Sequence, residues 1–177
     1  MTSRGGWFVN SKHLRTCAEV VKILWIFMSL SDGYLFFKVE NVHISDLYDW
    51  SDPKQKGKYS RPKLKRRESA PSGSLVHINE EKIALFRHGE KVYAMQEKCP
   101  HLGGPLHLGD IEELPDKSLC VRCPWHSWRF SLDTGRLVLP KKDKVAITFP
   151  VTVDAEGNIS IGFLEFASDY FSGSGEF

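Results

Sequence analysis

The chain has 177 residues, of which 41% are hydrophobic and 26% are charged. That length suits one domain with an appendage, and that hydrophobic share excludes a chain that is disordered throughout. Four cysteines are too few for a disulfide scaffold at this length. We therefore expect an intracellular, reducing compartment, cytoplasmic in the first place and mitochondrial as the alternative, where clustered Cys and His act as metal ligands.

Residues 1–33 form an N-terminal extension whose structure the sequence leaves open. The stretch Cys17–Leu30 is apolar on all sides apart from Glu19 and Lys22, and only eight residues separate Lys22 from Ser31. A helix needs about 20 apolar residues to cross a bilayer, so we do not expect a membrane span. A loosely docked extension, a targeting segment and a membrane anchor all remain open.

A strand and then a basic insert follow. Tyr34–Val42 is rich in aromatic and β-branched residues, which predicts a strand. Residues 54–73 contain eight Lys or Arg, one Glu and almost no apolar residue, which predicts a flexible insert. This insert is either a solvated loop or a site for an anionic partner, such as a phosphate or a lipid. Its only aromatic residue is Tyr59, so base stacking has little support and we expect no nucleic-acid partner.

From Ser74 onward the sequence is typical of a β-protein. Short apolar runs alternate with turn signals rich in Gly, Asn and Asp. The expected strands are 75–78, 82–87, 91–95, 128–132, 145–153 and 158–162. We therefore expect an all-β domain over 34–168, a small sandwich or barrel of short antiparallel strands, with 169–177 as a C-terminal tail.

Two pairs of Cys and His interrupt this β-rich stretch. They are Cys99-Pro-His101 and Cys123-Pro-Trp-His126. Residues two apart face different sides of a helix, so the first pair needs a tight loop, which Gly103-Gly104-Pro105 can form. Pro124 excludes a regular strand through the second pair. Two loops that each offer one thiolate and one imidazole can hold one four-coordinate ion or one iron–sulfur cluster.

Two other interpretations concern the same cysteines. A structural zinc site uses the same ligand types, but this order differs from the C-x₂-C before H-x₃-H of zinc fingers. Cys120-Val-Arg-Cys123 could be a thioredoxin-like C-x-x-C, but it ends an expected strand instead of opening a helix. We therefore expect Cys120 to be a buried strand thiol, and His107 lies outside the ligand pattern.

The residues around both pairs resemble a known family. Cys99-Pro-His-Leu-Gly-Gly-Pro-Leu106 with Cys123-Pro-Trp-His-Ser-Trp-Arg-Phe130 is similar to the Rieske [2Fe–2S] signature, over about residues 74–162. The pattern resembles dioxygenase ferredoxins, nitrite reductase small subunits and, most of all, a small soluble Rieske-domain protein of animals. The resemblance implies a two-loop cluster-binding subdomain and one cluster per chain, with Cys99 and Cys123 on one iron and His101 and His126 on the other.

The neighbours of these ligands differ from those in the high-potential Rieske proteins of quinol-oxidising complexes. Those proteins have a disulfide where this chain has Gly104 and Trp125, and hydroxyl donors to sulfur where it has Trp128 and Phe130. Fewer donors to sulfur disfavour reduction, so we expect a potential in the lower third of the range of about −150 to +300 mV. The family usually has Gly where Ser127 stands, so a positive φ there would strain the backbone.

These features predict a low-potential one-electron carrier that serves an oxidoreductase partner. No His follows His126 and no G-x-G-x-x-G occurs, so we expect neither a mononuclear oxygenase iron site nor a nicotinamide site. The partner would dock at Leu102, Pro105 and Trp125. Two alternatives remain, a redox sensor whose stretch 54–67 binds a partner and an accessory subunit with a structural cluster.

Overall fold

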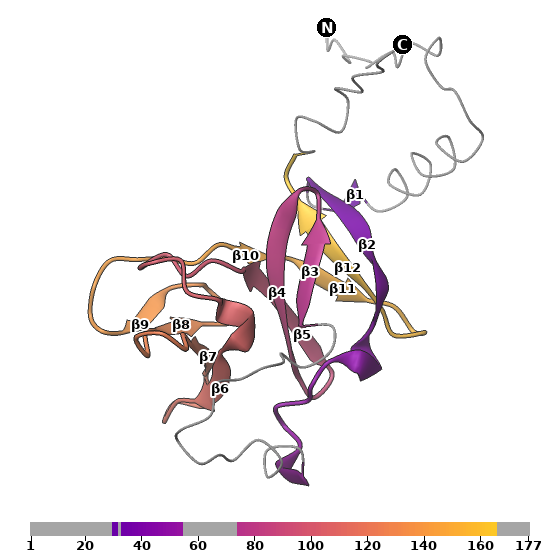
Figure 1. Cartoon of the computed structure of the whole chain (residues 1–177). Helices are drawn as coiled ribbons and strands as arrows, with labels where there is room; N and C mark the ends of the chain where they lie inside the picture. Colours follow the sequence, from indigo (N-terminus) through magenta and orange to yellow (C-terminus); the bar gives the residue numbers. More distant parts are fainter. Residues whose placement is uncertain (1–29, 32, 55–73, 166–177) are drawn as a thin grey trace, which may run out of the picture.

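The computed structural model describes residues 30–31, 33–54 and 74–165 (Figure 1). The N-terminal extension before residue 30, the basic insert over 55–73 and the tail after 165 therefore lie outside the described residues. In chain order the elements are β1 (Leu30–Ser31), β2 (Tyr34–His43), η2 (Ile44–Asp46), β3 (Leu75–Ile78), β4 (Glu81–His88), β5 (Lys91–Gln96), η3 (Leu106–Leu108), β6 (Asp110–Glu113), β7 (Leu119–Arg122), β8 (Arg129–Ser131), β9 (Leu137–Leu139), β10 (Thr148–Phe149), β11 (Val151–Val153) and β12 (Asn158–Phe163). No helix of the described part is long and apolar enough to cross a membrane.

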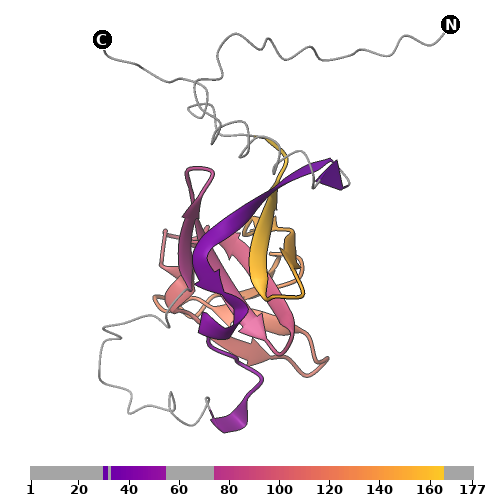
Figure 2. The same cartoon turned by 90° about the vertical axis from the view of Figure 1, so that its right-hand side faces the viewer.

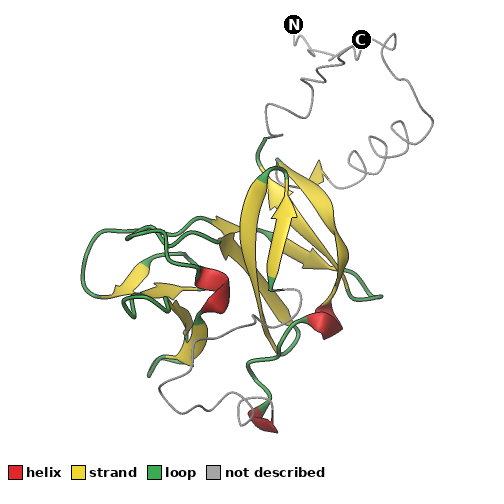
Figure 3. Cartoon of the chain, viewed as in Figure 1, coloured by secondary structure: helices red, strands yellow, loops and turns green. Residues whose placement is uncertain are grey.

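The strands form three antiparallel sheets of four strands each (Figure 3). The first sheet has the order β1-β2-β12-β11, the second β10-β5-β4-β3 and the third β6-β7-β8-β9. The third sheet lies to one side of the other two (Figure 1), and Figure 2 shows the same framework from the side. The all-β class and the antiparallel arrangement expected from the sequence are confirmed.

Strand β4 lies between two hydrophobic cores. Side chains alternate between the two faces of a strand. Ile83 and Leu85 therefore pack into the core shared with the first sheet, and Ala84 and Phe86 pack into the core shared with the third. All four are buried, which explains why this strand reads as a continuous apolar run. The second core also contains the cysteines of the Cys/His loops, so the fold supports the candidate site directly.

The single strand expected over 145–153 is wrong. The structure divides it into β10 and β11, which belong to different sheets. Pro150 separates them, and proline has no N–H to continue a ladder of hydrogen bonds. Its carbonyl oxygen still accepts a hydrogen bond from the Gly162 amide at 2.8 Å. The chain therefore passes from the second sheet to the first at this residue.

The segment that carries both Cys/His loops is inserted between two paired strands. Thr148 of β10 lies opposite Met95 of β5, so the ends of the segment 97–147 are neighbours. The Gln96 amide donates to the Ile147 carbonyl oxygen at 2.8 Å, and the Ile147 amide donates to Gln96 Oε1 at 2.9 Å. This segment corresponds to the two-loop subdomain expected from the sequence, and its strands β6 and β9 had no clear sequence signal.

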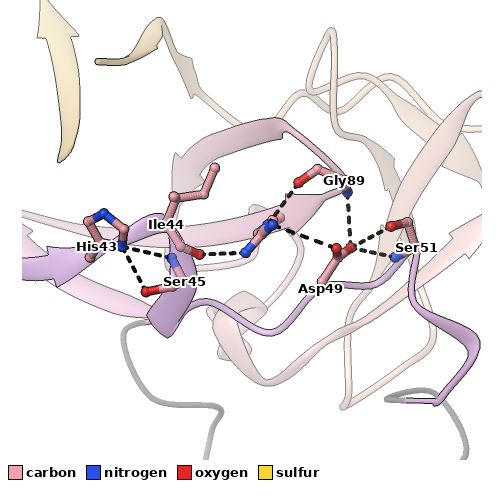
Figure 4. Close-up of polar contacts among 7 residues, drawn as sticks. His43, Ile44, Ser45, Asp49, Ser51 and Gly89 are labelled. Carbon is pink, nitrogen blue, oxygen red and sulfur yellow. Dashed lines mark hydrogen bonds and ion pairs between the residues drawn. The ribbon is translucent and has the colours of Figure 1, made fainter. Parts of the chain in front are cut away.

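A polar network holds the segment after β2 against the β4–β5 hairpin (Figure 4). Arg87 donates to the carbonyl oxygens of Gly89 and Ile44 at 2.8 and 3.0 Å. Asp49 accepts from the amides of Gly89 and Ser51 and from the Ser51 hydroxyl. Burial raises the pKa of Asp49, but these hydrogen bonds and the Arg87 guanidinium outweigh it, and the pKa lies below its ordinary value.

Candidate metal centre

The first Cys/His loop follows β5 and closes on itself. The Cys99 amide donates to the Gly104 carbonyl oxygen at 2.9 Å, and the Gly103 amide donates to the Cys99 carbonyl oxygen at 2.8 Å. Gly103 has φ +74°, which glycine adopts at little cost because it has no Cβ. The tight loop that the glycines predicted is confirmed, and it directs Cys99 and His101 to the same side.

The second loop connects β7 and β8. The Cys123 amide donates to the Trp128 carbonyl oxygen at 2.8 Å, and the Ser127 amide donates to the Cys123 carbonyl oxygen at 3.0 Å. Ser127 has φ +58°, so a residue with a side chain occupies the left-handed region here. The backbone at this position therefore has the conformation that favours the glycine usual in the family.

The structure brings the four expected ligands together. The donor atoms of Cys99, His101 and Cys123 all lie within 4.8 Å of one another. His126 completes the group, because its Nδ1 lies 2.6 Å from Nε2 of His101. Two thiols and two imidazoles from two separate loops therefore share one small volume, although 21 residues separate His101 from Cys123 in the sequence.

Burial divides the four side chains into two pairs. Cys99 and Cys123 are 2% and 0% exposed, whereas His101 is half-buried and His126 is exposed. The thiol side of the group thus faces the core, and the imidazole side faces solvent. Thiolates and imidazoles are the ligands that suit iron–sulfur centres, and a Rieske centre divides its ligands between its irons in the same way. The donor set of this structure fits such a cluster.

Comparisons with known proteins agree with this geometry. A family model described as soluble Rieske-type ferredoxin matches residues 63–149. The ferredoxin subunit of 3-phenylpropionate/cinnamic acid dioxygenase from Shigella flexneri is 35% identical over 97 residues, which are 54% of this chain and 86% of that protein. The chain belongs to the soluble Rieske-type ferredoxins.

Two further relatives show how far the likeness extends. A human Rieske domain-containing protein is 43% identical to this ferredoxin over 58 residues, which are 33% of this chain and 36% of that protein. The match therefore spans little more than a third of the human relative. A crystal structure from Mycobacterium tuberculosis, described as the small subunit of an NADH-dependent nitrite reductase, has a TM-score of 0.56. It is 17% identical and covers 75% of this chain and 97% of that one, which shows a shared fold.

The pKa values of the two cysteines of the ferredoxin site are shifted in opposite directions. The pKa of Cys123 is lowered to about 6, first by a hydrogen bond from Cys99 and also by the backbone amides of Trp125 and His126. The same hydrogen bond, together with burial, raises the pKa of Cys99. The hydrogen bond therefore favours the thiol form of Cys99 and the thiolate form of Cys123. Backbone amides near a sulfur also stabilise it as a metal ligand.

Gly104 and Trp125 face each other across the two loops. A Cβ on Gly104 would lie 2.8 Å from Cys123 Sγ and 3.2 Å from the nearest ring atoms of Trp125. Glycine is therefore the residue that lets the first loop approach the second this closely. Cys99, Cys120 and Cys123 are all free, so within the described residues the ferredoxin has no disulfide.

Trp128 and Phe130 occupy apolar positions beside the site. The Trp128 indole stacks on the His101 imidazole, with ring centroids 4.9 Å apart and planes inclined by 23°. Lys142 places its ammonium nitrogen 5.3 Å from the centroid of the Trp128 ring. Phe130 is fully buried. The sequence carries no signal that places Lys142 at the site, because 15 residues separate it from His126 and no motif links them.

Two residues near the site behave as the sequence predicted. His107 is outside the group of four, and its Nδ1 lies 2.9 Å from Glu97 Oε1. This contact closes the base of the first loop, since the Leu106 amide also donates to the Glu97 carbonyl oxygen at 2.8 Å. Cys120 is buried in β7, and burial raises the pKa of its thiol. Neither residue adds a donor to the candidate centre.

Proposed function

We propose that this ferredoxin binds one [2Fe–2S] cluster and carries single electrons for an oxidoreductase partner. Cys99 and Cys123 would bind the inner iron, and His101 and His126 the outer one. The observation that carries this proposal is the convergence of four donors whose thiols are buried and whose imidazoles face solvent. When bound, such a cluster supplies reversible one-electron chemistry at a fixed position.

The protein's own residues would set the conditions for this chemistry. The amides of Trp125 and His126 favour the thiolate form of Cys123. The half-exposed His101 and exposed His126 leave only a short distance between the site and a docked partner. Leu102 and Trp125 are 67% and 57% exposed, and they give this end of the molecule an apolar contact surface. Partner proteins would therefore dock at Leu102, Pro105 and Trp125.

The side chains around the site support a low reduction potential. Trp128 stacks on His101, and Phe130 is buried. Neither side chain has a hydroxyl group that could donate a hydrogen bond to a sulfur atom. Hydrogen bonds to sulfur raise the potential of such centres, and their absence at these two positions lowers it. We therefore expect a midpoint in the lower third of the Rieske range. A titration that gives a midpoint above roughly +100 mV contradicts this part of the proposal.

Cysteine variants with a matched control test the ligand set. Protein purified without oxygen should contain iron and sulfide, absorb visible light and give an EPR signal when reduced. Cys99→Ser should lose these signals, whereas Cys120→Ser should keep them, because Cys120 is an equally buried thiol of the same subdomain but is not a member of the donor group. A colourless, zinc-loaded wild-type protein, or equal loss of iron in both variants, contradicts the proposal.

The imidazole ligands have a separate signature. A ligating imidazole keeps one ring proton, which it releases more readily when the cluster is oxidised. The midpoint potential should therefore fall as pH rises from neutral to alkaline. A midpoint that stays constant over this range contradicts ligation by His101 and His126, even where the iron content is correct.

A further inference from the structure

The two loops that hold the candidate ligands have no permanent charge. Neither 99–106 nor 123–128 contains Asp, Glu, Lys or Arg. The electrostatic character of the surface around the exposed imidazoles must therefore come from the segments that border these loops. This makes the charge of the bordering segments the feature that selects a partner by electrostatics.

One bordering segment is the connection from β9 to β10, residues 140–147. It is the orange loop at the left edge of Figure 1, beside the third sheet. Lys142 fixes its position next to the site, since it lies over Trp128, which in turn stacks on His101. The Leu137 amide donates to the Lys144 carbonyl oxygen at 3.0 Å and holds the end of the loop to β9.

This loop is basic and apolar at once. It contains three lysines and one aspartate, and all four are exposed. Val145 and Ile147 of the same loop are also exposed. An exposed apolar surface with a charged border is typical of a protein–protein contact.

The lysine charges of this loop are not neutralised within the described part of the chain. No ion pair there joins Lys141, Lys142 or Lys144 to a carboxylate, whereas the nearby Arg122 and Arg129 both pair with Glu112. The field of the loop therefore extends toward an approaching molecule. Uncompensated charge beside a reaction site attracts partners of the opposite charge and speeds association.

From these contacts we propose that residues 140–147 form a docking surface for a redox partner whose own electron-transfer site has an acidic border. The proposal rests on the proposed function, because it gives the chemical class of the partner that meets the exposed imidazoles. Carboxylates of the partner would face Lys141, Lys142 and Lys144, and apolar groups would cover Val145 and Ile147. One electron then crosses between the two proteins without a bond being made or broken.

The test compares two small oxidants of opposite charge on the reduced, cluster-loaded protein. Ferricyanide is an anion and hexaammineruthenium(III) is a cation, and each accepts one electron. Lys141→Glu with Lys144→Glu reverses the loop charge and keeps the contact of Lys142 with Trp128. Lys117→Glu is the matched control, because Lys117 is exposed in the turn before β7, at the opposite end of that strand from Cys123.

At low ionic strength we expect the double variant to react roughly 10-fold more slowly with ferricyanide and several-fold faster with the ruthenium complex. Lys117→Glu should change both rates less than twofold, and the milder Lys141→Gln with Lys144→Gln should lie between. Salt should reduce the differences. Equal rates in all four proteins, with unchanged cluster spectra, overturn the proposal.

Binding of poly-L-glutamate, followed by calorimetry, gives a readout that does not depend on electron transfer. The double Glu variant should lose most of this binding. A variant of the basic insert, Lys65→Gln with Arg66→Gln and Arg67→Gln, should keep the part of the poly-L-glutamate binding that residues 140–147 contribute. Loss only in the insert variant overturns the docking surface. A protein without a reducible cluster contradicts the proposed function instead, so the two failures are distinguishable.

Discussion

Replacing Ser127 by glycine should stabilise the protein. Ser127 has φ +58° in the loop between β7 and β8. Glycine adopts this conformation freely, whereas a side chain crowds the backbone there. The substitution removes no hydrogen bond of the backbone, because the amide of residue 127 still donates to Cys123 and its carbonyl oxygen still accepts from Arg129. No hydrogen bond within the described residues uses the Ser127 hydroxyl.

The expected gain in the free energy of unfolding is the backbone strain that is removed minus the conformational entropy that glycine adds to the unfolded chain. A left-handed conformation costs a residue with a side chain about 1–2 kcal/mol. Glycine loses about 0.5–1 kcal/mol because its unfolded chain is more flexible. The net gain is therefore about 0.5–1 kcal/mol. With a urea m-value of about 2 kcal/mol/M, the unfolding midpoint should rise by roughly 0.25–0.5 M.

Urea unfolding of the cluster-free protein is the measurement. Ser127→Ala is the first control and should change stability by less than about 0.5 kcal/mol, since alanine keeps a Cβ. Ser160→Gly in β12 is the second and should destabilise by about 0.5–1 kcal/mol, because Ser160 lies within a strand and does not have a positive φ. If glycine at 127 lowers the midpoint as much as glycine at 160, the loop stores no such strain.

Three other substitutions follow from contacts of the structure. Gly104→Ala places a Cβ 2.8 Å from Cys123 Sγ, so iron per chain should fall and stability should drop by about 1–3 kcal/mol, measured by metal analysis and urea unfolding. Gly135→Ala places a Cβ 1.9 Å from the Ala146 carbonyl oxygen at φ +67°, and a loss of about 3 kcal/mol or more should unfold the segment 97–147, measured as a partial loss of the circular dichroism signal. Asp49→Asn should cost about 1–3 kcal/mol at pH 7. Folding lowers the pKa of Asp49, so the ionised carboxylate stabilises the protein above its unfolded pKa of about 3.9, and this stabilisation is lost as pH falls through the folded pKa. An equal loss of stability in the variant at pH 7 and at pH 2.5 would contradict this.

The sequence predicted that the two Cys/His pairs lie together, because the information within each pair is local. Each Cys/His pair lies within four residues, and proline and glycine restrict each loop by backbone geometry alone. The same locality applies to the hairpin strands β3, β4 and β5. The division of 145–153 into two strands was missed, although Pro150 was visible, because an apolar run does not show which sheet each half joins.

Contacts between distant segments had no sequence signal. The stack of His101, Trp128 and Lys142 joins three loops, and its distances depend on how the third sheet packs. The sequence did not predict the left-handed backbone of Ser127, because serine rarely adopts a positive φ. It indicated only that a positive φ at this position would be strained. The network of Arg87 and Asp49 depends on the passage of the chain from β2 to the β4–β5 hairpin, which neither residue's neighbours predict.

The insertion of the segment 97–147 between β5 and β10 determines which part of the protein can unfold first. The segment 97–147 leaves and re-enters the framework at adjacent residues, and the bonds between Gln96 and Ile147 close its base. The core of the first two sheets contains no residue of this segment. The subdomain can therefore unfold as a separate cooperative unit while the framework stays intact. Amide hydrogen exchange should accelerate in 97–147 when the metal is removed and remain slow in β4 and β12, so loss and reloading of the centre would not require the whole domain to refold.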